Sequence, residues 1–303
     1  MSLRELKNIP ASIRARLLNE ARESGESYDL VLQYFVIERF LYRLSRTDWA
    51  ERLVVKGAIM LRAWGTPLGR PTRDIDFLGR LDRSPEGVAK TVRECLAVDY
   101  PDGLVFDPDI ETVEINARDE YPGTRVILRG NLDGGTFKLQ LDVSIDDAVV
   151  PDPEWVEYPT LLDLDSPRIL AYQPVTALAE KYETIVSKGI ENSRLRDYYD
   201  IWLLSTSHSH SGSDLAAAIT ATFAHRETVL PSEVASGLAA SFYSDPERQS
   251  RWKSFLDTKG VDAPADLAEV CDAIVAFITP PATAAAMGAE FTLTWSPSLG
   301  WSA

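Results

Sequence analysis

Apolar side chains recur at helical spacing in two segments near the start of the chain. In residues 11–23, Ile13 and Leu17 fall on one face, and Ser12 is a plausible N-terminal cap. The next segment, 28–45, is apolar nearly all round. A helix of that kind belongs in the interior of a protein, so we expect it to be buried.

The middle of the chain shows the patterns of strands. The predicted strands are 53–55, 74–79, 110–115, 124–129 and 137–145. Gly134-Gly135 indicates a hairpin-like turn between the last two. Helices are predicted at 58–64 and at 84–97, where Ser84-Pro85 has the form of a helix start.

Beyond a proline-containing connection at 151–167, the pattern becomes helical. Pro174 opens a helix that runs through Lys188 and stops at Gly189. Further helices are predicted at about 194–205, 214–226, 232–243 and 265–278. The predicted organisation is therefore an α+β core followed by a helical domain, with boundaries at 1–50, 51–168, 169–280 and 281–303.

Two C-terminal segments have weaker signals. The sequence SHSHSGS at 207–213 is typical of a low-complexity polar loop, in which His208 and His210 have no third metal ligand in sight. Pro280-Pro281 should end the last helix. The tail at 282–303 carries two tryptophans, which suit either a partner-docking role or self-packing.

Composition narrows the class of protein. With 303 residues, 45% of them hydrophobic and 25% charged, the chain is long and apolar enough for a sizeable core. No apolar stretch was expected to approach the roughly 20 residues of a bilayer-spanning helix, so we expect no membrane partner. The N-terminus lacks the apolar segment of a secretion signal. Cys95 and Cys271 form no disulfide framework or zinc motif, so a reduced, cytoplasmic protein is expected.

Charge is distributed unevenly along the chain. The net charge is −15, which argues against coating nucleic acid by charge alone. Residues 1–80 nevertheless carry an excess of four positive charges, and the remaining residues an excess of 19 negative ones. The N-terminal part could hold a local polyanion site, although a solvated acidic surface is the simpler interpretation of charge alone.

The motif Asp74-Ile75-Asp76 is the first candidate for chemistry. On a strand, its two carboxylates face the same side while Ile75 and Phe77 face the core. Paired carboxylates suit Mg²⁺, which bridges them to substrate phosphates, and two such ions can steady an in-line phosphoryl displacement. Taken alone, the motif is more often an ordinary solvated strand edge.

Asp142 strengthens the case for a metal site. In residues 138–145 the apolar side chains alternate strictly, so Gln140, Asp142 and Ser144 share the polar face. If this strand neighbours the one carrying Asp74 and Asp76, three carboxylates converge. Because such carboxylates repel one another, the arrangement is costly without cations, and Mg²⁺, or alternatively Mn²⁺, is the expected cofactor.

A turn upstream of the carboxylates offers a phosphate-binding element. Lys56-Gly57-Ala58 lies between a predicted strand and a predicted helix, where glycine lets a phosphate approach backbone N–H groups. Arg70, Thr72 and Arg73 follow and could contact a triphosphate. A turn glycine with a surface lysine, and solvated loop arginines, are the commoner explanations of each feature alone.

The helical half contributes a lysine and two aspartates. Lys181 lies at the border of an apolar helix face, where it either covers the core or contacts a phosphate. Asp197 and Asp200 lie three residues apart on one helix face. Pairing of Asp197 with Arg194 or Arg196 is at least as plausible as a catalytic role.

Together these motifs resemble the AbiEii/AbiGii family of nucleotidyltransferase-like toxins, which are related to the MenT toxins. The resemblance rests on Val55–Leu61 (VKGAIML) followed by Arg70–Phe77 (RPTRDIDF), on Ala179-Glu180-Lys181 and on Arg196–Asp200 (RDYYD). The segments Ser12–Leu18 and Glu38–Leu44 are also similar to one branch of the family. Matching stretches run from about residue 10 to about residue 205.

This resemblance implies a polymerase-beta-like nucleotidyltransferase core that transfers a nucleoside monophosphate from a nucleoside triphosphate to a hydroxyl. Asp74, Asp76 and Asp142 would ligate metal, and Asp142 would activate the acceptor. Lys181 would hold the triphosphate, with support from Asp197 or Asp200. The implied partners are a tRNA 3′ end and an antitoxin of the AbiEi type.

The chain departs from the pattern of the wider superfamily at one position, and two alternative functions remain. The wider superfamily has Gly-Ser at the phosphate turn, whereas this chain has Gly57-Ala58, so backbone N–H groups must replace the serine hydroxyl. A phosphatase with an aspartate nucleophile would want an apolar strand before Asp74 and ranks low. A non-catalytic nucleotide- or partner-binding module would be expected to have lost a ligand, but the three carboxylates and Lys181 are all present.

Overall fold

The chain divides into two units, which we call the sheet unit and the helical unit. The sheet unit comprises Met1–Ala63, Pro71–Asp146 and Glu154–Ala171, and the helical unit comprises Trp64–Arg70, Asp147–Pro153 and Tyr172–Ala303. The computed structural model describes residues 8–66, 71–82, 84–115, 123–144 and 146–303. The predicted phosphate contact Arg70 lies outside these residues.

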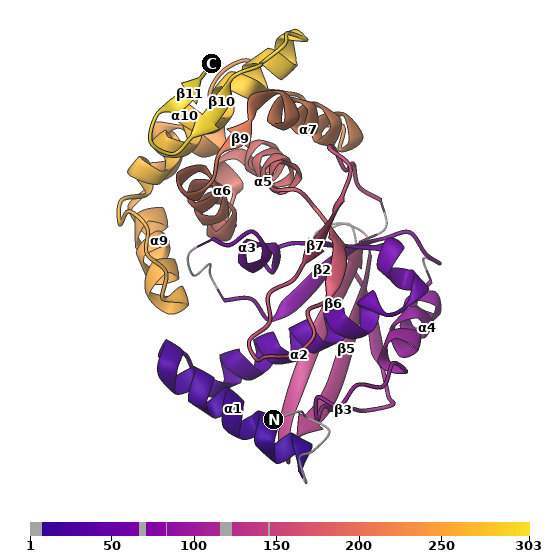
Figure 1. Ribbon diagram of the computed structural model, residues 1–303. Helices are drawn as coiled ribbons and strands as arrows, with labels where there is room; N and C mark the ends of the chain where they lie inside the picture. The colour runs from indigo at the N-terminus through magenta and orange to yellow at the C-terminus, as the bar shows by residue number, and fades with distance from the viewer. Residues whose placement is uncertain (1–7, 67–70, 83, 116–122, 145) are drawn as a thin grey trace. The chain divides into compact units, whose positions relative to one another are not determined.

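The sheet unit is built on an eight-stranded mixed sheet (Figure 1). The strand order is β3-β5-β6-β2-β1-β8-β7, and β4 also pairs with β5. The strands are β1 (Leu53–Lys56), β2 (Asp74–Gly79), β3 (Val105–Phe106), β4 (Glu111–Ile115), β5 (Gly123–Leu132), β6 (Gly135–Ser144), β7 (Glu154–Glu157) and β8 (Arg168–Ala171). The β2–β6 and β1–β8 pairs are parallel, and the remaining pairs are antiparallel.

Three helices pack on one face of this sheet: α1 (Ile9–Ser24), α2 (Tyr28–Ser45) and α4 (Pro85–Leu96). The helix-facing side chains of β6 are buried and apolar, including Leu139, Leu141 and Val143. The alternate residues of β6 point to the other face, because successive side chains of a strand alternate. That other face carries the predicted carboxylates.

Helix α2 is the central helix of the sheet unit. Thirteen of its 18 residues are buried, as its apolar sequence predicted. Ser27 caps it by accepting a hydrogen bond from the Leu30 N–H. The cap predicted for α1 is wrong: Asn8, rather than Ser12, accepts the N–H of Ala11 at 3.2 Å, so the helix begins earlier than the apolar pattern indicated.

The helical unit contains α5 (Pro174–Lys188), α6 (Leu195–Ser207), α7 (Gly212–His225), α8 (Ala240–Tyr243), α9 (Pro246–Lys259) and α10 (Leu267–Met287). The predicted helix at 232–243 is instead a 3₁₀ turn, Ser236–Leu238, followed by the short α8. Helix α9 was not predicted, because Trp252 is its one buried side chain and the helix has little apolar periodicity.

The C-terminal tail forms a small sheet with the predicted polar loop. Strands β9 (His210–Ser211), β10 (Thr294–Ser296) and β11 (Gly300–Ser302) pair in the order β11-β10-β9 (Figure 1). The prediction of a low-complexity loop at 207–213 is therefore wrong. His210 is buried against Phe277, and its Nε2 lies 3.0 Å from the Leu204 carbonyl oxygen.

Helix α10 does not end at Pro280-Pro281, contrary to prediction. A proline inside a helix deprives the carbonyl four residues earlier of its donor. At Pro281 the loss falls on Phe277, whose carbonyl oxygen instead accepts the indole N–H of Trp301 at 2.9 Å. The tail thus replaces a donor that proline removes, which helps the helix to continue.

By length and composition, α10 could cross a membrane, because it has 21 residues and most of them are apolar. The expectation that no apolar stretch approaches this length is therefore wrong. The helix contacts α6 and α7, and its buried residues recur at helical spacing on one face. Packing in the interior of the helical unit therefore accounts for the apolar residues on that face.

The predicted α+β class is confirmed, with a mixed sheet flanked by helices and a helical C-terminal part. Strands β3, β7 and β8 were not predicted. β3 has two residues, β7 has the half-charged sequence EWVE, and β8 has four residues. Such short or polar strands lack the alternation on which the prediction depended.

Candidate active site

Four charged residues form a row across four adjacent strands of the sheet unit. Lys56 on β1 is the register partner of Asp76 on β2, Asp76 is the partner of Asp142 on β6, and Asp142 is the partner of Arg125 on β5. Directly opposed residues on neighbouring strands project from the same face. The row therefore places two negative charges between two positive ones on the face opposite the helices.

Asp74 joins the two aspartates of this row. One carboxylate oxygen from each of Asp74, Asp76 and Asp142 lies within 4.8 Å of the others, and all three residues are partly exposed. Mg²⁺ binds oxygen at about 2.0–2.1 Å in octahedral geometry, so two ligands of one ion lie roughly 3 Å apart when adjacent and roughly 4 Å apart when opposite. A small adjustment of side chains would bring the three oxygens to these separations, so the group fits a divalent cation.

Hydrogen bonds orient these carboxylates. The Thr72 hydroxyl donates to Asp74 Oδ1 at 2.5 Å, which fixes the side chain at the start of β2. One residue before Asp74, the carbonyl oxygen of Arg73 accepts a hydrogen bond from the side-chain amide of Gln33 on α2 at 2.8 Å, which holds the segment that enters β2. The predicted triphosphate contacts Thr72 and Arg73 thus have a structural part in positioning Asp74.

Asp142 accepts hydrogen bonds from two side chains. The Arg125 guanidinium donates from Nε to Oδ1 at 2.8 Å and from NH2 to Oδ2 at 2.7 Å, and the Gln140 amide donates to Oδ2 at 3.1 Å. Such a two-pronged pair is among the stronger ion pairs that proteins form. Arg125 was not identified from the sequence: the turn was predicted at Gly134-Gly135, one residue too late, and the observed turn at Asp133-Gly134 sets the register that pairs Arg125 with Asp142.

The turn at Gly57 lies directly against Asp76. Gly57 has a φ of +79°, and a Cβ atom built on it would come within 1.9 Å of Asp76 Oδ2. Only glycine satisfies both requirements without displacing the carboxylate. Lys56 is buried and Ala58 is partly exposed. Binding of a phosphate by Lys56, Gly57 and Ala58 stays a prediction.

Lys181, Asp197 and Asp200 belong to the helical unit. Lys181 Nζ lies 2.7 Å from Asp200 Oδ2 and 3.3 Å from Asp197 Oδ1. Asp200 is fully buried and Asp197 nearly so, while Lys181 is 16% exposed. The three residues therefore form one ion-paired cluster, and the roles of Lys181 and the aspartates in binding or catalysis stay predictions.

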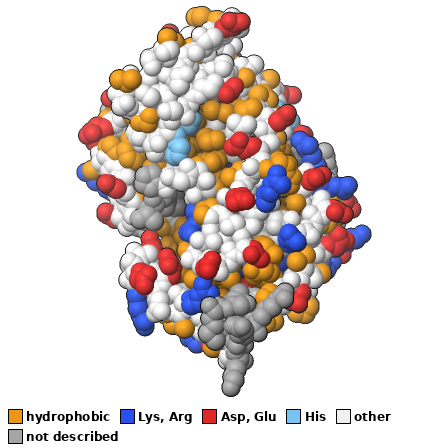
Figure 2. Space-filling model, viewed as in Figure 1, with side chains coloured by type: hydrophobic (Ala, Val, Ile, Leu, Met, Phe, Trp, Pro, Cys, Tyr) orange, Lys and Arg blue, Asp and Glu red, His pale blue; other side chains and the backbone are white. Residues whose placement is uncertain are grey.

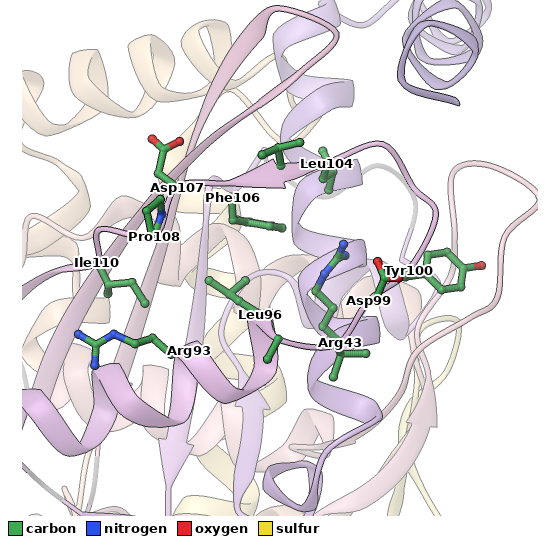
Figure 3. A pocket seen from close by; sticks show the side chains of 13 residues that line it. Arg43, Arg93, Leu96, Asp99, Tyr100, Leu104, Phe106, Asp107, Pro108 and Ile110 are labelled. Atoms are coloured by element: carbon green, nitrogen blue, oxygen red, sulfur yellow. The ribbon is translucent and has the colours of Figure 1, made fainter. Parts of the chain in front are cut away.

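A separate cavity of about 520 Å³ lies on the helix-covered side of the sheet unit (Figure 3). Arg43, Tyr100 and Phe106 are among its lining residues. Arg43 already forms a two-pronged ion pair with Asp102 and lies over the Phe106 ring. Phe106 contacts Phe137, whose side chain points to the helices, so this cavity is remote from the carboxylates on the opposite face.

Neither the cysteines nor the visible surface charge suggests a competing site. Cys95 and Cys271 are buried, and burial raises the pKa of each thiol to about 12, which disfavours the reactive thiolate. On the face seen in Figure 2, acidic and basic side chains are interspersed. The carboxylates of the sheet unit therefore remain the strongest candidate for chemistry in the described residues.

Comparison with known proteins gives a family. The family model described as "Nucleotidyl transferase AbiEii toxin, Type IV TA system" matches residues 39–278. A search of curated proteins gives no significant match. Among solved structures, the chain is similar to a candidate nucleotidyltransferase from H. pylori, at 17% identity and a TM-score of 0.45, with 86% of this chain and 96% of that chain covered. It is also similar to JHP933 from Helicobacter pylori, at 16% identity and a TM-score of 0.47, with 86% and 94% covered.

The family match extends over most of the chain, from the second half of α2 into α10. It includes the strands that carry Asp74, Asp76 and Asp142, and these side chains have the placement that a nucleotidyltransferase needs for its acidic ligands. The chain therefore belongs to the AbiEii family of nucleotidyltransferase toxins of type IV toxin–antitoxin systems.

Proposed function

We propose that this enzyme transfers a nucleoside monophosphate from a nucleoside triphosphate to the 3′ end of tRNA, and so blocks translation. In this reaction the acceptor oxygen forms a bond to the α-phosphorus, the bond from that phosphorus to the bridging oxygen breaks, and pyrophosphate leaves. The observation that carries the proposal is the convergence of three carboxylates on one face of the sheet. Membership of the family supports the reaction class.

The residues of the sheet unit suit this chemistry. When bound, Mg²⁺ would be held by Asp74, Asp76 and Asp142 and would supply charge neutralisation for the triphosphate and for the attacking oxygen. Asp142 would take the proton of the acceptor hydroxyl. Thr72 and the Gly57 turn keep Asp74 and Asp76 in place by the contacts described above.

The biological setting follows from the family as an expectation. A toxin of a type IV system has an antitoxin partner, and we propose one of the AbiEi type. Inhibition of growth by the free toxin would serve abortive infection as a phage defence. We place this activity in the cytoplasm, where nucleoside triphosphates and tRNA are available.

The test is a transfer assay with purified protein. The full chain is incubated with Mg²⁺, one labelled nucleoside triphosphate at a time, and total tRNA, and labelled RNA is resolved on a gel. We expect label to enter tRNA with one or more nucleotides. Label that enters no RNA with any nucleotide would contradict the proposed acceptor.

Matched variants separate catalysis from mere binding. Asp76→Asn removes a charge from the carboxylate group and should abolish transfer. Glu111→Gln removes a charge on β4, where Glu111 is exposed and paired with Arg129, and should leave transfer unchanged. If nucleotide binds to the wild-type chain but no acceptor is ever labelled, the alternative of a non-catalytic nucleotide-binding module is favoured.

A further inference from the structure

The cross-strand row contains a cation whose role the proposed function does not explain. Arg125 projects from β5 beside the third carboxylate, and the order of charges along the row is positive, negative, negative, positive. With Asp74 included, the five side chains sum to a charge of −1. The protein thus neutralises most of its acidic site from its own residues.

The geometry of the Arg125 pair limits what Asp142 can bind at the same time. The guanidinium engages both oxygens of Asp142, and Gln140 engages Oδ2 a second time. A carboxylate has about four lone-pair positions, so three of them are in use. A metal ion at about 2.1 Å would have to share Oδ1 with a charge-assisted hydrogen bond, or to take the place of that bond.

We propose that Arg125 is a built-in counter-ion that competes with the divalent cation for Asp142. This inference rests on the proposed function, because it takes Asp142 as a metal ligand. Arg125 neutralises Asp142 while the metal site is empty, and it is displaced when the cation binds. The displacement also frees lone pairs of Asp142 for the proton of an acceptor hydroxyl, so it links metal binding to activation of the site.

The exposed fractions of the two side chains indicate that Arg125, and not Asp142, moves when the ion pair opens. The Arg125 side chain is 38% exposed, whereas Asp142 is 13% exposed and lies on an interior strand of the sheet. When the pair opens, water can solvate the long, partly exposed arginine, which offsets part of the cost of breaking a strong ion pair, while the carboxylate is held between β2 and β5. Once one divalent cation is present, the same five side chains and the ion sum to +1, so electrostatics no longer favour the guanidinium at this position.

The test measures binding of Mn²⁺ to the purified full-length protein by electron paramagnetic resonance, without nucleotide and without any activity assay. Arg125→Gln should bind Mn²⁺ at least about five-fold more tightly than the wild type, because a positive charge and a competing donor are removed. Arg125→Lys keeps the positive charge but cannot form the two-pronged pair, so its affinity for Mn²⁺ should lie between those of the wild type and Arg125→Gln. Arg129→Gln is the matched control: Arg129 lies four residues along β5 and pairs with the exposed Glu111, so its loss should leave the affinity unchanged.

Equal or weaker Mn²⁺ binding by Arg125→Gln would overturn the proposal, since a residue that merely orients Asp142 for the metal would weaken binding when removed. Circular dichroism of the metal-free variants checks that they are folded. If Arg125→Gln does not fold, Arg125→Lys decides by the same criterion. Asp76→Asn tests the underlying site separately: if it binds Mn²⁺ as well as the wild type does, the metal assignment itself fails, whatever the arginine variants show.

Discussion

Two clusters of acidic side chains in this chain are neutralised in different ways. In the sheet unit, Asp74, Asp76 and Asp142 are partly exposed and gather around a space that fits a divalent cation. In the helical unit, Asp197 and Asp200 are buried and share the ammonium group of Lys181. With Lys56 and Arg125 the first cluster sums to a charge of −1, and with Lys181 the second sums to −1 as well, so the two differ in burial rather than in charge balance.

The difference separates a binding arrangement from a structural one. Carboxylates that remain near solvent can exchange their partners, and removing one of them costs little folding free energy. Buried carboxylates lose their hydration on folding, so removing the cation that compensates them is strongly destabilising. Substitutions in the first cluster should therefore impair function, and substitutions in the second should first impair stability.

The largest effect is expected at Asp74. Asp74→Asn should lower nucleotidyl transfer by about a thousand-fold or more, because a metal ligand of the transition state is lost. The free energy of unfolding should change by less than about 1 kcal/mol, since the asparagine still accepts the Thr72 hydroxyl at a partly exposed position. Transfer assays and urea unfolding measure the two quantities. A large loss of stability with transfer intact would reverse the comparison.

Removing the cation of the second cluster should have the opposite signature. Lys181→Met leaves buried Asp197 and Asp200 without the ion pairs that Lys181 provides, and should cost about 3–5 kcal/mol of unfolding free energy. Lys188→Met, at the exposed end of the same helix, should change stability by less than about 0.5 kcal/mol. If both variants unfold at the wild-type denaturant concentration, Lys181 has no structural role, and its predicted contact with a triphosphate becomes its main function.

The elements that carry the carboxylates could be predicted from the sequence. The segment at 74–79 coincides with β2, and the alternation in 138–144 gave the polar face of β6, because both strands bury one face against helices. Elements without such a contrast were missed: half of the residues of β7 are charged, and α9 buries one side chain. The extension of α10 beyond Pro280 depends in part on Trp301, a residue more than 20 positions away, so local sequence could not reveal it.

The acidic residues of the site and Lys56 were predicted, but Arg125, the second cation of the row, was not. Asp74, Asp76 and Asp142 share a recognisable alternation, whereas Arg125 lies in a segment, 124–129, whose polar face carries no motif. Its partnership with Asp142 depends on hairpin register, which the turn sets and the strand does not. Likewise, the reason for glycine at position 57 is the closeness of Asp76, which is a tertiary contact.

A third acidic group, Glu38, can be compared with the two clusters. Glu38 on α2 is buried, and desolvation raises its pKa from 4.5 to about 7 despite the nearby Arg39 and the Leu161 N–H. Arg39 NH2 lies 2.8 Å from Glu38 Oε1 and also donates a hydrogen bond to the Asp165 carbonyl oxygen at 3.0 Å, so Glu38 shares this guanidinium with a second acceptor. Arg39 therefore compensates the negative charge of Glu38 incompletely, so protonation of Glu38 should contribute to the stability of the folded chain.

The resulting pH dependence has a definite sign. Between pH 4.5 and about 7 the folded chain keeps a proton on Glu38 that the unfolded chain releases, so stability falls as pH rises through this window and levels off above it. The fall attributable to this group is about 3 kcal/mol at most. Glu38→Gln should remove it, so the variant gains stability relative to the wild type from pH 5 to pH 8 in urea unfolding. A constant difference between the two proteins across that range would contradict the raised pKa.

The smallest effect is expected at the Phe277 carbonyl oxygen, which accepts a hydrogen bond from Trp301 in the C-terminal tail. Trp301→Phe preserves an aromatic ring against Phe277 but removes the N–H that bonds the Phe277 carbonyl, and should cost about 1–2 kcal/mol. Pro281→Ala supplies the sharper control, because alanine at that position can donate its backbone N–H to the same carbonyl. In a Pro281→Ala background the cost of Trp301→Phe should therefore shrink, as a thermodynamic cycle from urea unfolding would measure. An unchanged cost would mean that Trp301 stabilises the tail by ring packing alone and that α10 tolerates its prolines for another reason.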